Sequence, residues 1–218
     1  MPSKYIWLFD PGHGGIVHGE YQTAGKRSPV LEDGRQLFEG VFNREIVRRL
    51  IQHCEDNTID YVNLVDTQID LPLRTRTDLA NDIYRRSLQH GGRHCIYVSV
   101  HANAYTPTNK LQFNTANGWE VYTTPGETKS DRIANVFFNK MKLAFPDKNF
   151  RTDYADNDPD KEANFFVLRK TVMPAILTEN FFMTNREEVE LLLSDAGRDA
   201  IADAHFAAMQ EIEGSSIV

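Results

Sequence analysis

The sequence has few of the features that mark disulfide-stabilised, membrane-spanning or nucleic-acid-binding proteins. It has only two cysteines, Cys54 and Cys95, and neither lies in a C-x-x-C pair, so we expect two buried free thiols and no disulfide framework. No apolar run approaches the ~18 residues that span a bilayer. The net charge of −7 argues against nucleic acid as the main partner, because phosphate binding needs a basic face.

Signals for export and for further modules are also lacking. The opening MPSKYIWLFDPG has neither the long apolar core nor the small-residue cleavage site of a secretory leader. We therefore expect a protein that stays in the cytosol until another route releases it, or the mature form of an exported one. Since there is no internal repeat and no Pro/Ser/Gly linker, we expect residues 1–218 to form one domain. We also expect a monomer.

Short apolar runs alternate with segments of helical periodicity along the whole chain. The runs typical of buried strands are 5–9, 61–65, 95–100, 119–123, 165–168 and 175–177. Helical spacing marks 39–54, 72–89, 130–143, 187–193 and 199–212. This alternation predicts an α/β fold, a single three-layer domain whose mainly parallel sheet of about six strands carries helices on both faces. Two polar, irregular segments, 18–36 and 147–162, interrupt the pattern.

The ends of the predicted strands carry the residues of greatest chemical interest. His13 follows the first strand in DPGHGG, His101 follows CIYVSV, Glu179 follows MPAILT, and Glu39 opens the first long helix. Alone, DPGHGG is equally compatible with a tight turn or a metal-ligand platform, and it matches neither phosphate-loop pattern. Together, two histidines and a carboxylate suit a zinc site with an open fourth position, and a second carboxylate suits a general base.

The chain resembles the zinc-dependent N-acetylmuramoyl-L-alanine amidases of the Amidase_3 type. The matching segments appear in the family's order: LFDPGHGG, FEGVFNREIVRRL, LPLRTRTDLAN, YVSVHANA, GWEVYTT, KEANFFVLR and MPAILTENFFMTNREEVELL. They cover nearly the whole chain, from about residue 5 to about residue 193. No cell-wall-binding repeat follows them, so the resemblance implies a catalytic domain without a separate wall-binding domain.

The resemblance implies a role for each matched site residue. His13, Glu39 and His101 would bind one Zn²⁺ per chain, and Glu179 would be the catalytic glutamate. Glu45 lies a helical turn beyond the ligand position and does not fit it. Four further residues are expected behind the ligands or against the substrate: Asp10, Arg76, Asn103 and Asn180.

Of these four, Asp10 would orient a ligand or accept hydrogen bonds from loop amides. Arg76 is expected to be structural. Asn180 stands where relatives often have a smaller residue, so it would narrow the pocket or bind substrate.

The implied reaction is hydrolysis of the amide between the lactyl group of N-acetylmuramic acid and L-alanine of the stem peptide. A water at the zinc would be the nucleophile, and Glu179 would act as general base and then acid. The substrate would be peptidoglycan or muropeptide. Two alternatives remain open, a zinc peptidase that cuts within the stem peptide and a non-catalytic wall-binding module of amidase ancestry. We expect both irregular segments to shape substrate choice.

Overall fold

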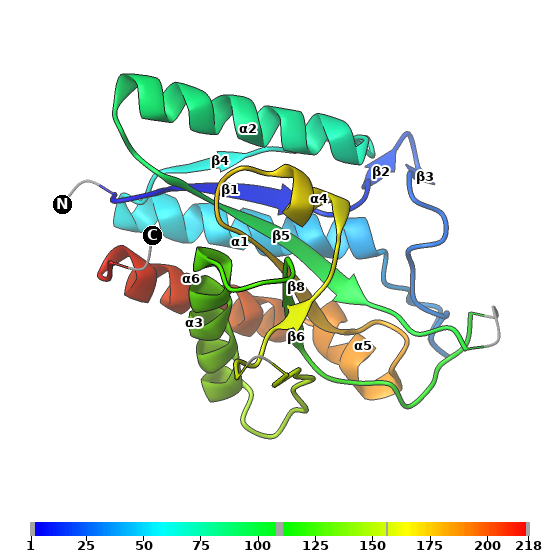
Figure 1. Ribbon diagram of the computed structural model, residues 1–218. Helices are drawn as coiled ribbons and strands as arrows, with labels where there is room; N and C mark the ends of the chain where they lie inside the picture. Colours follow the sequence, from blue (N-terminus) through cyan, green and yellow to red (C-terminus); the bar gives the residue numbers. More distant parts are fainter. Residues whose placement is uncertain (1–2, 108–110, 156, 217–218) are drawn as a thin grey trace.

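A six-stranded sheet forms the centre of the molecule, with strand order β4-β1-β5-β8-β6-β7 (Figure 1). The computed structural model describes residues 3–107, 111–155 and 157–216. The strands are β1 (Ile6–Pro11), β4 (Tyr61–Asn63), β5 (Cys95–Asn103), β6 (Glu120–Thr123), β7 (Lys161–Glu162) and β8 (Ala175–Phe182). A separate hairpin, β2 (Ile16–Val17) and β3 (Glu20–Tyr21), follows β1.

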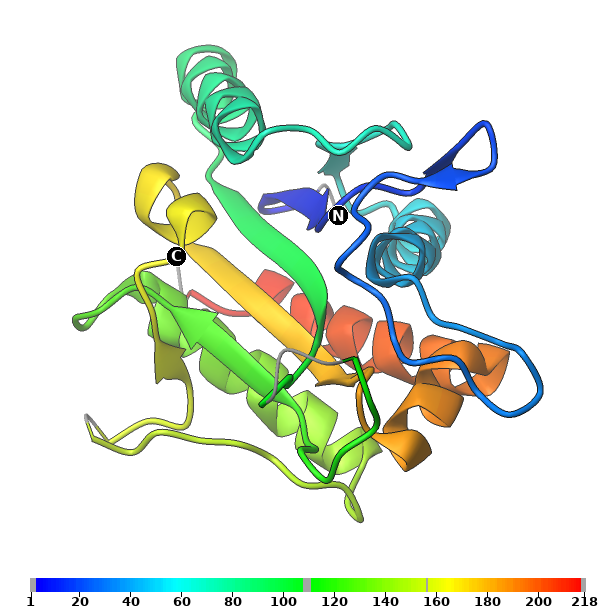
Figure 2. The same ribbon diagram turned by 90° about the vertical axis from the view of Figure 1, so that its right-hand side faces the viewer.

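Helices cover both faces of this sheet, as Figure 2 shows nearly end-on. On one face, α1 (Glu39–Asn57), α3 (Lys129–Ala144) and α6 (Asp195–Glu213) enclose the larger hydrophobic core, with α5 (Arg186–Leu193) beside α6. On the other face, α2 (Leu73–His90) and the short α4 (Phe166–Lys170) cover a smaller core. The predicted three-layer α/β class is confirmed.

Four neighbouring strands, β4, β1, β5 and β8, run parallel, and this brings their carboxyl ends to one edge of the sheet. β1 pairs with β4 and β5, and β5 pairs with β8, all in parallel, whereas β6 is antiparallel to β8. β1, β5 and β8 are apolar and buried on both faces, as expected for strands covered by two helical layers. In an open α/β sheet this edge is where ligands bind.

Two predicted elements differ in the structure. The strand expected at 165–168 is wrong, because this run is extended only at Phe165 and then forms α4. A four-residue apolar run fits a buried strand or a buried helical turn equally well, so periodicity could not separate them. The last helix begins at Asp195 and not at residue 199, because the Ser194 side chain accepts a hydrogen bond from the amide of Gly197 and caps it.

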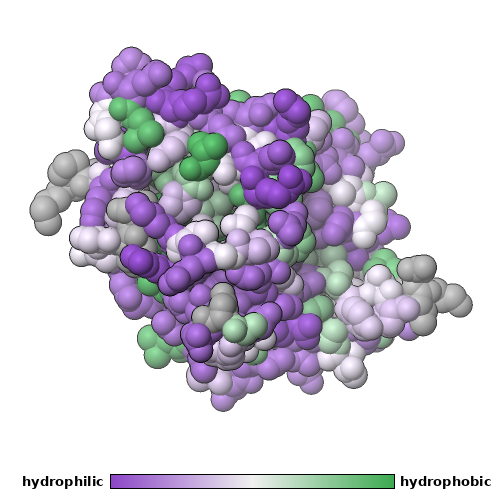
Figure 3. Space-filling model, viewed as in Figure 1, coloured by the Kyte–Doolittle hydropathy of each residue, from purple (hydrophilic) through white to green (hydrophobic). Residues whose placement is uncertain are grey.

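The remaining surface and core agree with the composition. Cys54 and Cys95 are both buried free thiols, as predicted. The face seen in Figure 3 is mostly hydrophilic, with hydrophobic side chains scattered over it. Among the described residues, no helix combines the length and the apolar character needed to cross a bilayer.

Candidate metal centre and active site

His13 follows the end of β1 in a tight turn between glycines, and its backbone conformation is unusual. Its φ is +63°, in the left-handed region that is uncommon for a residue with a side chain. Gly12, just before it, packs against the His101 ring so closely that a Cβ would lie 2.1 Å from His101 Cε1. The absence of a side chain at Gly12 therefore lets the ends of β1 and β5 bring both histidines together.

Glu39 is the first residue of α1, and its placement also depends on close backbone packing. A Cβ on the next residue, Gly40, would lie 1.9 Å from the carbonyl oxygen of Gly14, so α1 begins against the turn that follows β1. Further along the helix, Asn43 donates a hydrogen bond from Nδ2 to the carbonyl of Gly12, at 3.0 Å. The glutamate carboxyl is thereby held, 1% exposed, beneath the two histidines.

The three side chains converge on one point. Glu39 Oε1 lies 3.1 Å from His13 Nε2 and 3.0 Å from His101 Nδ1. The two imidazole rings stand nearly perpendicular, at 87°, with centroids 5.0 Å apart. One ligand atom from each of the three residues lies within 4.8 Å of the other two, so the set could hold a metal ion.

The charge and hydrogen bonding of this cluster fit a divalent metal. Burial works to raise the pKa of Glu39, but the hydrogen bonds and charges of His101 and His13 outweigh it and hold that pKa well below its usual range. The second carboxylate oxygen, Oε2, is buried and has no hydrogen-bond partner among the described residues. An ionised carboxylate with a free buried oxygen beside two imidazoles is the donor set that zinc prefers.

Glu179 lies beside this cluster on the neighbouring strand. It stands opposite His101 in the β5–β8 pairing and opposite Glu120 in the β6–β8 pairing. Its Oε2 is buried and has no hydrogen-bond partner within the described part of the chain. Burial, and then the negative charges of Glu39 and Glu120, raise the pKa of Glu179 well above its ordinary value. This carboxyl is therefore a strong proton acceptor whenever it is ionised.

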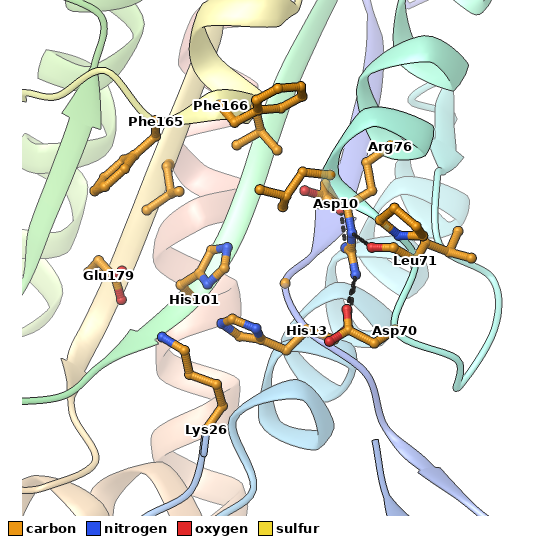
Figure 4. Close-up of a pocket in the computed structure, with 15 residues that line it drawn as sticks. Asp10, His13, Lys26, Asp70, Leu71, Arg76, His101, Phe165, Phe166 and Glu179 are labelled. Atoms are coloured by element: carbon orange, nitrogen blue, oxygen red, sulfur yellow. Dashed lines mark hydrogen bonds and ion pairs between the residues drawn. The ribbon is translucent and has the colours of Figure 1, made fainter. Parts of the chain in front are cut away.

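A cavity of about 490 Å³ opens over these residues, a size that suits a small ligand or one portion of a larger one. Figure 4 shows Glu179, His101 and His13 along one side, with the Lys26 ammonium pointing into the space between them. Phe165 and Phe166 stand on the other side, and further apolar lining comes from Leu71, Pro72, Leu73 and Val167. The cavity thus joins a polar, reactive end to an apolar end.

Comparison with known proteins identifies the family. The family model described as N-acetylmuramoyl-L-alanine amidase, Amidase_3, matches residues 8–211. The chain belongs to the Amidase_3 family. The cluster of His13, Glu39 and His101 is consistent with a metal site typical of this family.

Curated relatives are identical to this Amidase_3 chain at about a quarter of the aligned positions. The endolysin of Bacillus phage SPP1 is 25% identical over 214 residues, which cover 96% of this chain and 66% of that protein. N-acetylmuramoyl-L-alanine amidase CwlM of Bacillus licheniformis is 29% identical over 200 residues, 91% of this chain and 64% of that protein. The chain therefore spans about two thirds of the length of these relatives.

Solved structures share the fold over almost their full length. An N-acetylmuramoyl-L-alanine amidase from Clostridium difficile 630 superposes with a TM-score of 0.73 at 24% identity, covering 98% of this chain and 99% of that one. N-acetylmuramoyl-L-alanine amidase AmiC2 of Nostoc punctiforme gives 0.72 at 25% identity, covering 99% and 100%. The arrangement of sheet and helices is thus that of solved amidase domains.

Asp10 and Arg76 form a buried ion pair beneath the His13 turn of this Amidase_3 domain. Arg76 Nη1 lies 2.5 Å from Asp10 Oδ1, and both side chains are at most 2% exposed. Arg76 also donates to the carbonyls of Pro11 and His13, at 2.8 and 3.1 Å. Asp10 also accepts hydrogen bonds from the hydroxyls of Tyr97 and Ser99, and within the described part of the chain its side chain makes no hydrogen bond with a ligand side chain or a loop amide. It therefore acts through Arg76, which braces the turn.

The two asparagines lie behind the site, at different depths. Asn180 is fully buried on the opposite face of β8 from Glu179, where it accepts from Trp119 Nε1 and donates to the His101 carbonyl, each at about 2.9–3.0 Å. The expectation that Asn180 narrows the pocket or binds substrate is therefore wrong, because strand alternation turns it into the core. Asn103 donates a hydrogen bond to Glu120, the residue that stands opposite Glu179 in the β6–β8 pairing.

Two residues of the site were missed from sequence. Lys26 comes from the irregular segment 18–36, whose path no periodicity could predict. Glu120 did carry a signal, a charged residue between Trp119 and Val121 in an apolar strand, and it is 2% exposed. Glu45 pairs with Arg49 on the surface of α1, away from the cluster, in agreement with Glu39 as the ligand.

The histidines without a ligand match lie elsewhere. His205 is fully buried in the core, between the Ile201 carbonyl and the Thr178 hydroxyl. His53, on α1, places its Nε2 2.8 Å from Asp203 Oδ1 of α6 at the surface.

Proposed function

We propose that this chain is a zinc-dependent N-acetylmuramoyl-L-alanine amidase that hydrolyses the amide between the lactyl group of N-acetylmuramic acid and L-alanine in peptidoglycan or muropeptides. One observation carries the proposal: three ligand atoms from His13, Glu39 and His101 lie within 4.8 Å beside the unpartnered carboxyl of Glu179. Family membership and the apolar extension of the cavity support it. On this proposal, residues 1–218 form a single catalytic domain.

Each site residue has its own role in the proposed amide hydrolysis. His13, Glu39 and His101 hold the metal, which requires both imidazoles to be neutral at the ligating nitrogens. Zinc, when bound, would supply a Lewis acid for the scissile carbonyl and would acidify a water. Glu179 Oε2 takes the proton of the attacking water and passes it to the leaving amine of L-alanine.

Product analysis tests the proposal directly. The purified chain is incubated with a defined muropeptide, and mass spectrometry follows the products with chelator present and after zinc is restored. An amidase releases an intact stem peptide with a free L-alanine amine and leaves a glycan with a free lactyl carboxyl. Shortened stem peptides would identify a peptidase, and intact substrate with zinc fully bound would identify a non-catalytic module.

Metal content separates the ligand assignment from the activity. We expect His13→Ala to lose both bound zinc and turnover, since it removes one of three protein ligands. The matched control is His90→Ala, at the exposed end of α2, which should keep both. Stoichiometric zinc in the His13 variant would overturn the ligand assignment.

A further inference from the structure

The turn that carries His13 lies beyond the end of β1, so its peptide groups bond largely to groups outside the sheet. The Gly12 amide still donates to the Val100 carbonyl of β5, at 3.0 Å. Beyond it, the Gly14 amide donates to the Thr23 hydroxyl at 2.9 Å. Because backbone groups need hydrogen-bond partners, the side chains that supply them decide where the turn lies, and with it the His13 imidazole.

Two guanidinium groups bind the carbonyl oxygen of His13 itself. Arg44 Nη1 lies 2.9 Å from this oxygen, and Arg76 Nη2 lies 3.1 Å from it. The residue that they hold is in the left-handed conformation, with φ at +63°. In a residue with a side chain, this conformation persists only where the surrounding structure imposes it. The two arginines are placed to impose it on His13.

The two arginines differ in how their charge is balanced. Arg76 pairs with the carboxylates of Asp10 and Asp70. Arg44, which is half-buried, forms no ion pair in the part of the chain that the structure describes, and its Nη2 is buried there without a hydrogen-bond partner. A cation that is drawn out of water without a counter-ion is costly to keep. The position of Arg44 therefore indicates a role other than charge pairing.

The guanidinium of Arg44 links the backbones of two candidate metal ligands. Its Nη1 donates both to the His13 carbonyl and to the Gly40 carbonyl, each at 2.9 Å, and Gly40 directly follows Glu39 at the start of α1. Its Nε donates to the Thr67 carbonyl in the loop after β4, also at 2.9 Å. Since the guanidinium is a rigid plane with donors in fixed directions, it holds the turn, the helix start and this loop in one arrangement.

We propose that Arg44 is a positioning residue for the metal site, which fixes the His13 turn against the start of α1 so that His13 and Glu39 are set for zinc in advance. The inference rests on the proposed zinc site. The hydrogen bonds of Arg44 go to backbone carbonyls and not to ligand side chains, so it acts through geometry. Ligands that are already in place lose less conformational freedom when the metal binds, and the affinity is higher for it.

Zinc affinity of the full chain, measured by competition with a chelator of known affinity, tests the proposal without any turnover. We expect Arg44→Met to weaken zinc binding roughly ten- to hundredfold, the usual effect of removing a group that holds a metal ligand. Arg44→Lys keeps the charge but loses the fork of donors, so it should weaken binding severalfold. The matched control is Arg48→Met, an exposed arginine one turn further along α1, which should leave the affinity unchanged.

Two further readouts separate positioning from a general loss of stability. The visible spectrum of the Co²⁺-loaded protein, which reports ligand geometry, should change in Arg44→Met and not in Arg48→Met. Ile46→Val, in the buried core of the same helix, should lower Tm by about 3 °C and leave zinc affinity unchanged.

Different outcomes overturn different statements. Wild-type zinc affinity in Arg44→Met would overturn this inference and leave the amidase proposal standing. An equal loss in Arg48→Met, or in Ile46→Val, would also overturn it, because charge or stability would then explain the effect. If Arg44→Met does not fold, wild-type affinity in Arg44→Lys decides against the inference in the same way. A wild-type chain that binds no zinc would instead overturn the metal site on which both proposals rest.

Discussion

Glu120 and Glu179 stand opposite each other on neighbouring antiparallel strands, the first buried and the second half-buried, and their surroundings differ sharply. Glu120 on β6 is saturated with donors: Arg151 Nε and Lys161 Nζ each lie 2.9 Å from its Oε2, and Oε1 accepts from Asn103 and from the Tyr122 hydroxyl. Like charges directly across a sheet are unfavourable, and these cations offset that repulsion. The Glu120 carboxylate is thus held in place by four donors.

Glu179 on β8 has the opposite environment. Its Oε2 makes no hydrogen bond among the described residues, and it faces the cavity with the Lys26 ammonium nearby (Figure 4). A carboxylate whose oxygens are all occupied by donors cannot readily accept a proton from the attacking water, whereas one left free beside another carboxylate can. The comparison shows what separates a structural carboxylate from a catalytic one. The difference is whether hydrogen-bond donors occupy both of its oxygens, more than whether the residue is buried.

Replacing Glu179 should give the largest effect on activity. We expect Glu179→Gln to lower kcat by about 10²–10⁴, because the amide cannot take up and return a proton. Its zinc content should stay stoichiometric and its Tm should not fall, since the carboxyl has no donor to lose. Turnover on muropeptide, metal analysis and thermal unfolding check this. Near wild-type turnover with zinc bound would show that the base is another group.

The same substitution at Glu120 should act mainly on stability. Glu120→Gln leaves Lys161 and Arg151 without their anionic partner, at a cost of about 2 kcal/mol in the free energy of unfolding once their partial exposure is allowed for. We expect kcat to fall less than tenfold. Urea unfolding and turnover, measured on both variants side by side, decide the matter. An inactive but fully stable Glu120→Gln would reverse the roles assigned to the two glutamates.

The sequence was sufficient to predict that Glu179 lies beside the metal ligands, but not to predict the surroundings of Glu120. His13, His101 and Glu179 each follow directly on a strand, and the carboxyl ends of parallel strands meet at one edge, so their proximity could be anticipated. The Amidase_3 resemblance then indicated Glu39 among the helix carboxylates. Here local pattern and topology agree, which is the condition under which sequence reasoning works.

The cations around Glu120 and Glu179 come from segments without periodicity. Lys26, Arg151 and Lys161 lie in the two irregular stretches, where neither a helical nor a strand repeat fixes which way a side chain points. Asn180 failed for a different reason, because the expectation ignored that adjacent residues of a strand face opposite sides. Donor saturation at Glu120 could thus be known only from three-dimensional structure.

His205 on α6 is a buried titratable group that packs against the face of β8 opposite Glu179, where it hydrogen-bonds the Thr178 hydroxyl, and its titration gives a further test at acid pH. Burial lowers the pKa of His205 to about 4 in the folded protein. Its unfolded value is near 6.5, so the unfolded chain binds more protons between about pH 6.5 and 4, and stability falls as pH drops through that window.

We expect the stability advantage of wild type over His205→Gln to shrink by about 2 kcal/mol from pH 7 to pH 5. Urea unfolding at each pH measures this difference, in which metal loss common to both proteins cancels. A difference that does not change with pH would mean that His205 is protonated in the folded state.

The smallest effect is expected from the cation on the cavity side of Glu179. Lys26 and Lys161 both act to lower the pKa of Glu179, but Lys161 is bound to Glu120 whereas the Lys26 ammonium forms no ion pair among the described residues. Lys26 is also exposed, so its removal costs no packed contact. Its backbone, in contrast, is fixed, because its carbonyl accepts from the Glu39 amide at 2.9 Å and from the Tyr21 hydroxyl at 2.8 Å.

Lys26→Met should therefore lower kcat/KM about tenfold, roughly 1.4 kcal/mol of transition-state stabilisation, with Tm unchanged. Lys129→Met, an exposed lysine at the start of α3, is the control with the same charge change and should leave both quantities as they are. A loss of Tm in Lys26→Met would mean that the side chain holds the segment in place. Unchanged kcat/KM would mean that Glu179 works without a cation on its open side, so that the Glu120 carboxylate and the metal ligands alone set its environment.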